Sequence, residues 1–139
     1  MGCDIHGTVE RLIGGKWVMV KTLAYEDYNS LIRSGVLDRN YERFSRLAGV
    51  RSYGDETDRD ALGIPDDVSD GTQYHVDNWG CDGHSHSYMD IVEASKIWGD
   101  TERVELKDYE KDDLVAHYFG IHLKPLEEKL YRVVFWFDN

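Results

Sequence analysis

Apolar and more polar residues alternate from residue 3 to residue 13, which is the period-two pattern of a half-buried β-strand. Gly14-Gly15 then predicts a two-residue hairpin turn, and residues 16–23 predict the returning strand. Because side chains two residues apart share a face of a strand, one face of the first strand is expected to enter the core. The opposite, polar face carries Asp4, His6, Thr8 and Glu10.

The turn also predicts which residues of the two strands lie opposite each other. Counting back from the two glycines places Trp17 opposite Leu12 and Leu23 opposite His6. A further strand is expected near the end of the chain, since residues 130–137 are nearly all β-branched or aromatic. Such a run is typical of a central strand that is buried on both faces.

Two segments in the middle of the chain have contrasting patterns. Residues 41–48 carry apolar side chains at helical spacing and follow Asn40, a suitable N-cap, so they predict a short helix. Residues 54–72 are rich in Asp and Gly and include Pro65, so they predict an irregular acidic surface loop. The spacing of the acidic residues in this loop does not match that of a calcium-binding EF-hand loop.

Two more helices are expected in the second half of the chain. Ser87 with Asp90 three residues later fits a capping box, which predicts a helix that begins directly after His84-Ser85-His86. Another helix is expected over residues 108–119, ended by Gly120. The whole chain, residues 1–139, is therefore expected to form a single α+β domain. Its antiparallel sheet would contain an N-terminal β-hairpin and a C-terminal strand, packed by two to three short helices.

The charge of the chain limits its partners. A net charge of -11 would repel a phosphate backbone, because non-specific affinity for nucleic acid comes from Lys and Arg. This excludes polymeric nucleic acid and leaves a small anionic ligand, such as a nucleotide, which a local pocket can bind. No apolar run is long enough to cross a bilayer and no signal peptide is recognised, so no membrane partner and a cytoplasmic location are expected. Assembly of the chain into a homo-oligomer remains an open possibility at this point.

Two short clusters of His and Asp are the candidates for chemistry. In an extended segment residues i and i+2 point the same way, so one doublet of ligands is Asp4 with His6 and another is His84 with His86. Three imidazoles and a carboxylate suit a divalent transition metal, namely zinc, manganese, iron or nickel. Glu10 could activate a metal-bound water, and Asp82 could orient one of the histidines.

Plainer interpretations of the same residues stay open. His6 could be a hydrogen-bonded strand residue, and His84-Ser85-His86 a polar loop before a helix. Cys3 or Cys81 could instead serve as a nucleophile with a histidine as base, although neither lies in a recognisable nucleophile elbow.

The candidates for binding a ligand are two residues near the second cluster and two arginines. Trp79, between Asn78 and Gly80, is expected in a loop where its ring could stack on a base. Arg39 and Arg51 could contact a phosphate. Ser87 would present the N-terminus of its helix to an anion.

Several blocks of the sequence resemble a family of small uncharacterised bacteriophage and bacterial proteins. The family opens with Met-Gly-Cys-Asp-Ile-His, as residues 1–6 do here, and carries Asp-Gly-His-Ser-His-Ser, found here at residues 82–87. Further agreement covers residues 39–41, 47–51, 63–69 and 135–139. The acidic stretch after Arg51 departs from the family pattern, in which a longer glycine-rich segment is expected. The resemblance implies a phage origin, the cytoplasm of a bacterial host cell as location, and a site at the two clusters.

These expectations together favour a small phage-type metal-dependent hydrolase, most simply a phosphodiesterase for a small nucleotide or cyclic nucleotide signal. Two alternatives belong to other functional classes. One is a non-catalytic phage binding protein, a sponge that sequesters a nucleotide immune signal. The other is an acidic protein-binding inhibitor of host defence, for which the net charge of -11 is the motive.

Overall fold

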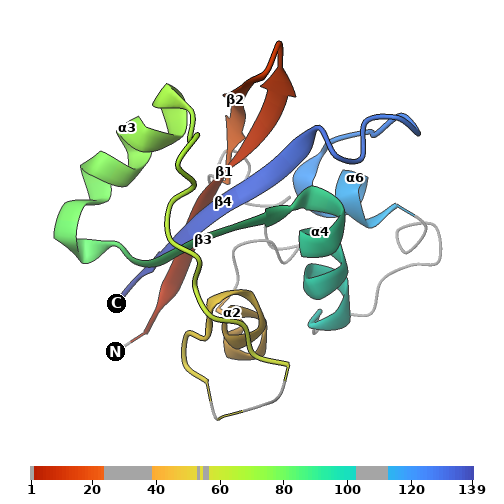
Figure 1. The fold of residues 1–139 in the computed structure, drawn as a ribbon. Coiled ribbons are helices and arrows are strands. Elements are labelled where there is room, and N and C mark those ends of the chain that lie inside the picture. Colours follow the sequence, from red (N-terminus) through yellow and green to blue (C-terminus); the bar gives the residue numbers. More distant parts are fainter. Residues whose placement is uncertain (1, 24–38, 53, 55–56, 103–112) are drawn as a thin grey trace.

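Four antiparallel strands form one sheet at the centre of the protein (Figure 1). The computed structural model describes residues 2–23, 39–52, 54, 57–102 and 113–139. The strand order in the sheet is β2-β1-β4-β3. The strands are β1 (Asp4–Ile13), β2 (Lys16–Thr22), β3 (His84–Asp90) and β4 (Tyr131–Asp138). The expected single α+β domain with an N-terminal hairpin and a C-terminal strand is therefore confirmed.

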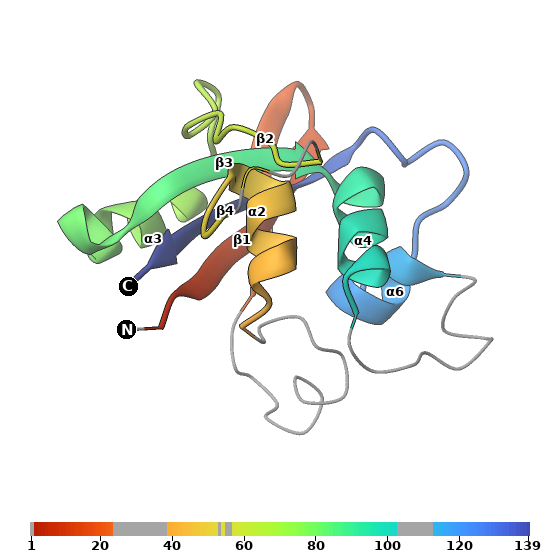
Figure 2. The same ribbon diagram turned by 90° about the horizontal axis from the view of Figure 1, so that it is seen from below.

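Helices cover both faces of this sheet. One face packs against α2 (Tyr41–Ala48), α4 (Ile91–Asp100) and α6 (Leu114–Phe119), which lie together below the strands in Figure 2. The opposite face packs against α3 (Asp70–Trp79), which a short 3-10 turn, η1 (Gly80–Asp82), connects to β3. In the described part of the chain these are four short α-helices, where two to three were expected. None of the described helices is long and apolar enough to cross a membrane.

The alternating side chains of β4 show why both faces must be covered. Val133, Phe135 and Phe137 belong to the larger core beneath α2, α4 and α6. Val134 and Trp136 form a second, smaller core with Val76 of α3. Because all of these side chains are buried, the prediction of a central strand buried on both faces is confirmed.

The N-terminal hairpin forms as predicted, with one shift in register. Leu12 pairs with Trp17 as expected, but an irregularity between Val9 and Glu10 changes the pairing beyond that point. The backbone nitrogen of Leu23 donates to the carbonyl of Gly7, so the prediction that Leu23 lies opposite His6 is wrong by one residue. A β-bulge inserts one residue into one strand of a pair, and a count from the turn cannot detect it.

The helix predicted over residues 41–48 is confirmed as α2, and the side chain of Asn40 caps it by accepting from the backbone nitrogen of Arg43. The predicted end of the last helix is confirmed as well, since Gly120 closes α6 in a left-handed conformation. That helix begins only at Leu114, after the N-cap Asp113. Residues 108–112 of the prediction lie outside the described residues.

The helix expected to begin after Ser87 starts three residues later. Residues 84–90 pair with β4 as the edge strand β3, and Asp90 caps α4 by accepting from the nitrogens of Val92 and Glu93. Ser87 is not an N-cap. Its hydroxyl accepts instead from the backbone nitrogen of Leu62. The two His residues of this segment thus lie in a strand rather than in a loop at a helix N-terminus.

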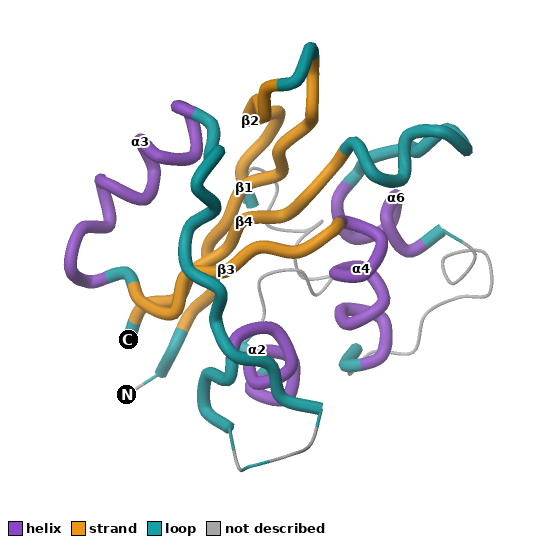
Figure 3. The backbone as a smooth tube through the Cα atoms, viewed as in Figure 1, coloured by secondary structure: helices purple, strands orange, loops and turns teal. Residues whose placement is uncertain are grey.

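The acidic segment before α3 crosses the sheet face as a long loop (Figure 3). Its backbone or side chains bond to three strands in turn, at His86 of β3, Arg132 of β4 and Glu10 of β1. The expected loop 54–72 ends earlier than predicted, because Ser69 caps α3 and residues 70–72 are helical. Trp79 is consequently the last residue of a helix and not part of a loop.

Candidate functional site

The start of β1, the end of β4 and the start of β3 meet at one end of the sheet. Asp4 pairs with Asp138 and His6 pairs with Trp136, while His84 pairs with Phe137 on the other side of β4. The two termini of the ribbon lie together at this end (Figure 1). The antiparallel pairing therefore brings both predicted clusters to the same end of the sheet, with β4 between them.

A His and Asp pair occupies the β1 side of this end. His6 Nε2 lies 2.6 Å from Asp138 Oδ1, and the two side chains are 25% and 23% exposed. Because a carboxylate only accepts, Nε2 carries the proton of this hydrogen bond. The His6 ring also lies 4.0 Å from the ring of Trp79. His6 is thus held by β1, by Asp138 from β4 and by Trp79 from α3, while part of it remains open to solvent.

Arg39 and Asp4 lie next to this pair. Arg39 holds both carboxylate oxygens of Asp4, with Nε 2.7 Å from Oδ1 and Nη2 3.2 Å from Oδ2. These hydrogen bonds lower the pKa of Asp4, and the charge of His6 acts in the same direction. Arg39 leaves Nη1 outside its bidentate contact with Asp4. At this end of the sheet, Arg39 therefore holds Asp4, and Asp138 holds His6.

His84 and His86 do not point toward a common centre. Ser85 has a positive φ of 55°, and the pairing of β3 with β4 shifts between His84 and Ser87. This irregularity places His84 beside Phe137 and stacks His86 on Trp136. Phe137 and Trp136 are consecutive in β4, so their side chains face opposite sides of the sheet. The two histidines therefore lie on opposite faces.

The four predicted metal ligands are consequently separated. Asp4 is engaged with Arg39 and His6 with Asp138, whereas His84 Nε2 lies 3.2 Å from Asn139 Oδ1. His86 is on the same face as His6, but the indole of Trp136 lies between them. Within the described ranges, no group of three or more His, Cys, Asp or Glu is arranged to hold a metal ion. This arrangement does not fit one centre for zinc, manganese, iron or nickel.

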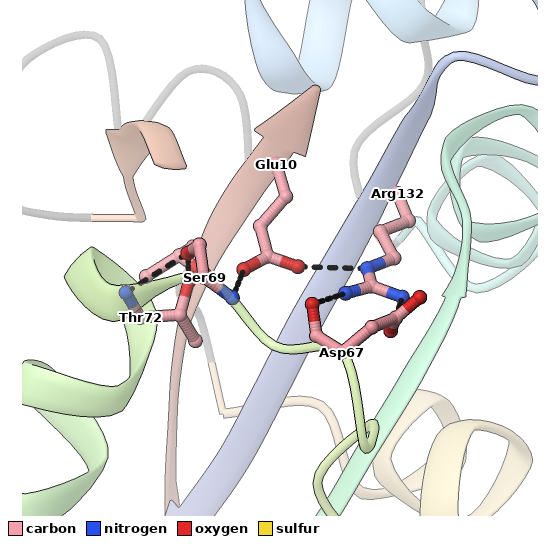
Figure 4. Close-up of polar contacts among 6 residues, drawn as sticks. Glu10, Asp67, Ser69, Thr72 and Arg132 are labelled. Carbon is pink, nitrogen blue, oxygen red and sulfur yellow. Dashed lines mark hydrogen bonds and ion pairs between the residues drawn. The ribbon is translucent and has the colours of Figure 1, made fainter. Parts of the chain in front are cut away.

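Glu10 lies in a buried polar network and not on an open face (Figure 4). It is 0% exposed, and its carboxylate accepts from Arg132 Nε at 2.7 Å and from the backbone nitrogen of Ser69 at 2.8 Å. Burial opposes the charged form, yet hydrogen bonds from Ser69, Arg132 and Thr72 hold the pKa of Glu10 below its ordinary value. Thr8, on the same face, bonds to Thr72 of α3. This network fixes α3 on the sheet and so positions Trp79 over His6.

The other predicted site residues are dispersed. Asp82 is exposed in η1, and none of its described neighbours bonds to it. Arg51 lies over the ring of Tyr41, 5.4 Å from its centroid, and its charge partly offsets the effect of burial on the pKa of Cys3. Ser87 is buried in β3. Of the four predicted ligand-binding residues, only Arg39 and Trp79 therefore lie beside His6.

The two cysteines differ in their surroundings. Cys3 is fully buried, and this burial raises the pKa of its thiol. A buried thiol with a raised pKa is a poor nucleophile. Cys81 is exposed in η1, with no described base in hydrogen-bond contact with it.

Asp138 belongs to this candidate site but is not among the residues predicted from the sequence. Its only sequence signal is its place as a carboxylate directly after the apolar run of the last strand. That position becomes informative only with the register of β4 against β1, which places Asp138 opposite Asp4 and beside His6.

His86 and Trp136 leave two buried nitrogens without a hydrogen bond. Neither His86 Nε2 nor Trp136 Nε1 has a partner among the described residues. Gly83 packs against both rings, since a Cβ there would lie 3.4 Å from Trp136 Cδ1 and 3.5 Å from His86 Nε2. Burial, and then the charge of His84, lower the pKa of His86. The folded protein therefore favours neutral His86.

This lowered pKa predicts a loss of stability in mild acid. The unfolded chain protonates His86 near its ordinary pKa of 6.5, so below that pH the unfolded state binds more protons than the folded state. The contribution of neutral His86 to the free energy of unfolding is complete above pH 6.5. It is lost as the pH falls toward the pKa of His86 in the folded protein. We expect the fall in Tm between about pH 7 and about pH 5 to be smaller in His86→Phe, measured by circular dichroism.

A matched control separates His86 from the other histidines. His122 is exposed and forms no described contact, so His122→Phe should retain the full wild-type fall in Tm. An equal fall in His86→Phe and wild type would contradict the assignment. Below the ordinary pKa values of 4.5 for Glu10 and 3.8 for Asp4, both of which are lowered in the fold, a further loss is expected in all three proteins.

The chain was compared with protein-family models, with curated proteins and with solved structures, and none of them matches it.

Proposed function

We propose that this protein is a small hydrolase that cleaves a phosphoester bond of a small nucleotide by general base catalysis at His6. The observation that carries this proposal is the hydrogen bond of 2.6 Å between His6 Nε2 and Asp138 Oδ1, in side chains that remain about a quarter exposed. A carboxylate that holds one imidazole nitrogen fixes the tautomer and leaves the other nitrogen as a base.

The base of the reaction is Nδ1 of His6, which bonds to no described residue. It takes a proton from water while the water oxygen forms a bond to phosphorus. The bond from phosphorus to the leaving oxygen breaks, and its electron pair stays on that oxygen, which takes a proton from solvent. His6 then releases its proton to solvent. Asp138 stabilises the imidazolium that forms in between.

Two neighbours would bind the substrate. Arg39, whose side chain is 56% exposed, can place Nη1 against a phosphate oxygen, because its contact with Asp4 uses only Nε and Nη2. Trp79 offers an indole beside the base on which a nucleobase can stack. Both side chains are held by described contacts, so the substrate would meet a largely prearranged surface.

The test is a turnover assay with defined substrates in the presence of EDTA. The panel contains 2′,3′-cyclic and 3′,5′-cyclic nucleoside monophosphates and cyclic dinucleotides, and products are separated by liquid chromatography. We expect cleavage of at least one compound by the wild type and by His122→Ala, and no cleavage by His6→Ala. An inactive wild type, or equal rates in His6→Ala and wild type, would contradict the proposal.

A second candidate is sequestration of the same class of ligand without cleavage. The contact between the rings of His6 and Trp79 favours it, since a rigid aromatic surface recognises a base without any chemistry. Calorimetric titration followed by heating of the complex distinguishes the two functions. Recovery of intact nucleotide would support sequestration, and recovery of the hydrolysed product would support catalysis.

A further inference from the structure

A groove lies along the outer edge of β3, away from the site at His6. It has a volume of about 500 Å³ and runs between β3, α2, the start of α4 and the loop around residues 59–62. Its apolar lining comes from Leu47, Leu62 and Met89, and Leu62 is 66% exposed.

The wall of this groove is a strand edge with free backbone groups. The backbone nitrogen of Gly63 donates to the carbonyl of His86 at 2.8 Å, on the side of β3 that faces away from β4. Peptide groups two residues apart in a strand point to the same side, so the N–H and C=O of Tyr88 also face outward. No other described segment bonds to the backbone of Tyr88 on that side. Gly63 thus pairs with the outer edge of β3 at His86, and the backbone groups of Tyr88, the next outward-facing residue, are left without a described partner.

The rim of the groove is predominantly acidic. Asp60, Asp90 and Glu93 line it together with Arg59, which is paired with Glu93, and Lys129 is paired with Asp90. Asp60 is exposed and has no described partner. In a protein with a net charge of -11, this rim adds to a field that attracts cations.

We propose that this groove binds a short extended peptide that carries Lys or Arg at alternate positions and adds to β3 as a fifth strand. Main-chain hydrogen bonds to Tyr88 would give affinity, as in other cases of strand addition. Alternate side chains of a strand point to opposite sides. The apolar residues of the peptide would therefore meet Leu47, Leu62 and Met89. Its basic side chains are long enough to reach from the strand to Asp60 and Glu93 at the rim of the groove.

The probe is the synthetic peptide acetyl-Lys-Val-Arg-Val-Lys-amide, titrated into 15N-labelled protein and followed by NMR. We expect saturable shifts of the amides of Leu62, Ser87, Tyr88 and Met89. The affinity should fall at least about tenfold when Asp60→Lys reverses one charge of the rim or when salt is raised from low to molar concentration. Asp66→Lys, an exposed change outside the groove, should bind the peptide as the wild type does.

Two control ligands separate strand addition from simple attraction of cations. A version of the peptide with all internal amides N-methylated cannot pair with β3 and should bind at least about tenfold more weakly. Spermidine tests the acidic rim alone. Unperturbed amides at Tyr88 and Met89 with millimolar peptide would overturn the proposal. Equal binding of the methylated peptide, or of spermidine at the same amides, would also overturn it. None of these outcomes depends on catalysis at His6.

Discussion

Replacing Arg132 by Met should destabilise the fold by about 3–5 kcal/mol, because it leaves the charge of Glu10 buried without its partner. Glu10 is 0% exposed, and Arg132 Nε lies 2.7 Å from its carboxylate. The guanidinium also bonds to the side chain and the carbonyl of Asp67, and lies 4.0 Å from the ring centroid of Trp17. Urea unfolding at neutral pH, followed by tryptophan fluorescence, measures the loss as a lower midpoint at unchanged slope.

Two further variants test whether the buried charge is the cause. In Glu10→Gln with Arg132→Met the carboxylate is gone, so the double variant should recover a substantial part of the loss. The side chain of Asp67, the second partner of Arg132, is 67% exposed. Asp67→Asn removes only this exposed ion pair and should cost less than about 1 kcal/mol of stability. If the double variant were as unstable as Arg132→Met alone, lost packing of the long Arg side chain would explain the effect better than charge does.

The loss of stability caused by Arg132→Met would also affect the candidate site. The network of Glu10, Arg132, Ser69 and Thr72 holds the N-terminal end of α3 on the sheet, while Trp79 at the other end of α3 lies against His6. We therefore expect partial unfolding of this face to release Trp79 before the larger core beneath α2, α4 and α6 opens.

Local patterns account for the parts of the fold that were predicted correctly. The hairpin turn at Gly14-Gly15 and the N-cap at Asn40 each depend on a few neighbouring residues, and β4 is a run of residues that suit only a buried strand. The sequence is enough in these three cases because each signal lies within a few consecutive residues.

The errors arise where contacts distant in sequence decide. Ser87 fits the sequence pattern of an N-cap. However, residues 84–90 form their backbone hydrogen bonds with β4, and Asp90, an equally suitable N-cap residue, begins the helix instead. Glu10 lies on the face that alternation predicts, yet only the position of α3 shows that this face is buried. The same limit applies to the site. The sequence placed His6 and Arg39 among its candidates, whereas Asp138 required the register of β4.

Asp138→Asn should lower the rate of hydrolysis by about 10²–10⁴-fold while the affinity for the nucleotide changes little. The Asn side chain can turn its NH₂ group toward His6 Nε2, which then accepts and moves the imidazole proton to Nδ1. The nitrogen that faces the substrate would lose its lone pair, and no base would remain. Initial rates across substrate concentrations should therefore show a reduced kcat with a nearly unchanged KM.

The tautomer itself is a readout that a purely structural role of Asp138 would not change. Long-range 15N NMR of the imidazole distinguishes protonation at Nε2 in the wild type from protonation at Nδ1 in Asp138→Asn. Asp66→Asn, an exposed change of the same charge, should leave both the spectrum and the rate as in the wild type. A normal rate in a variant with the shifted tautomer would show that His6 is not the base. If the wild type never cleaves the nucleotide and both the wild type and the variant bind it, the surface of His6 and Trp79 would instead be assigned to sequestration.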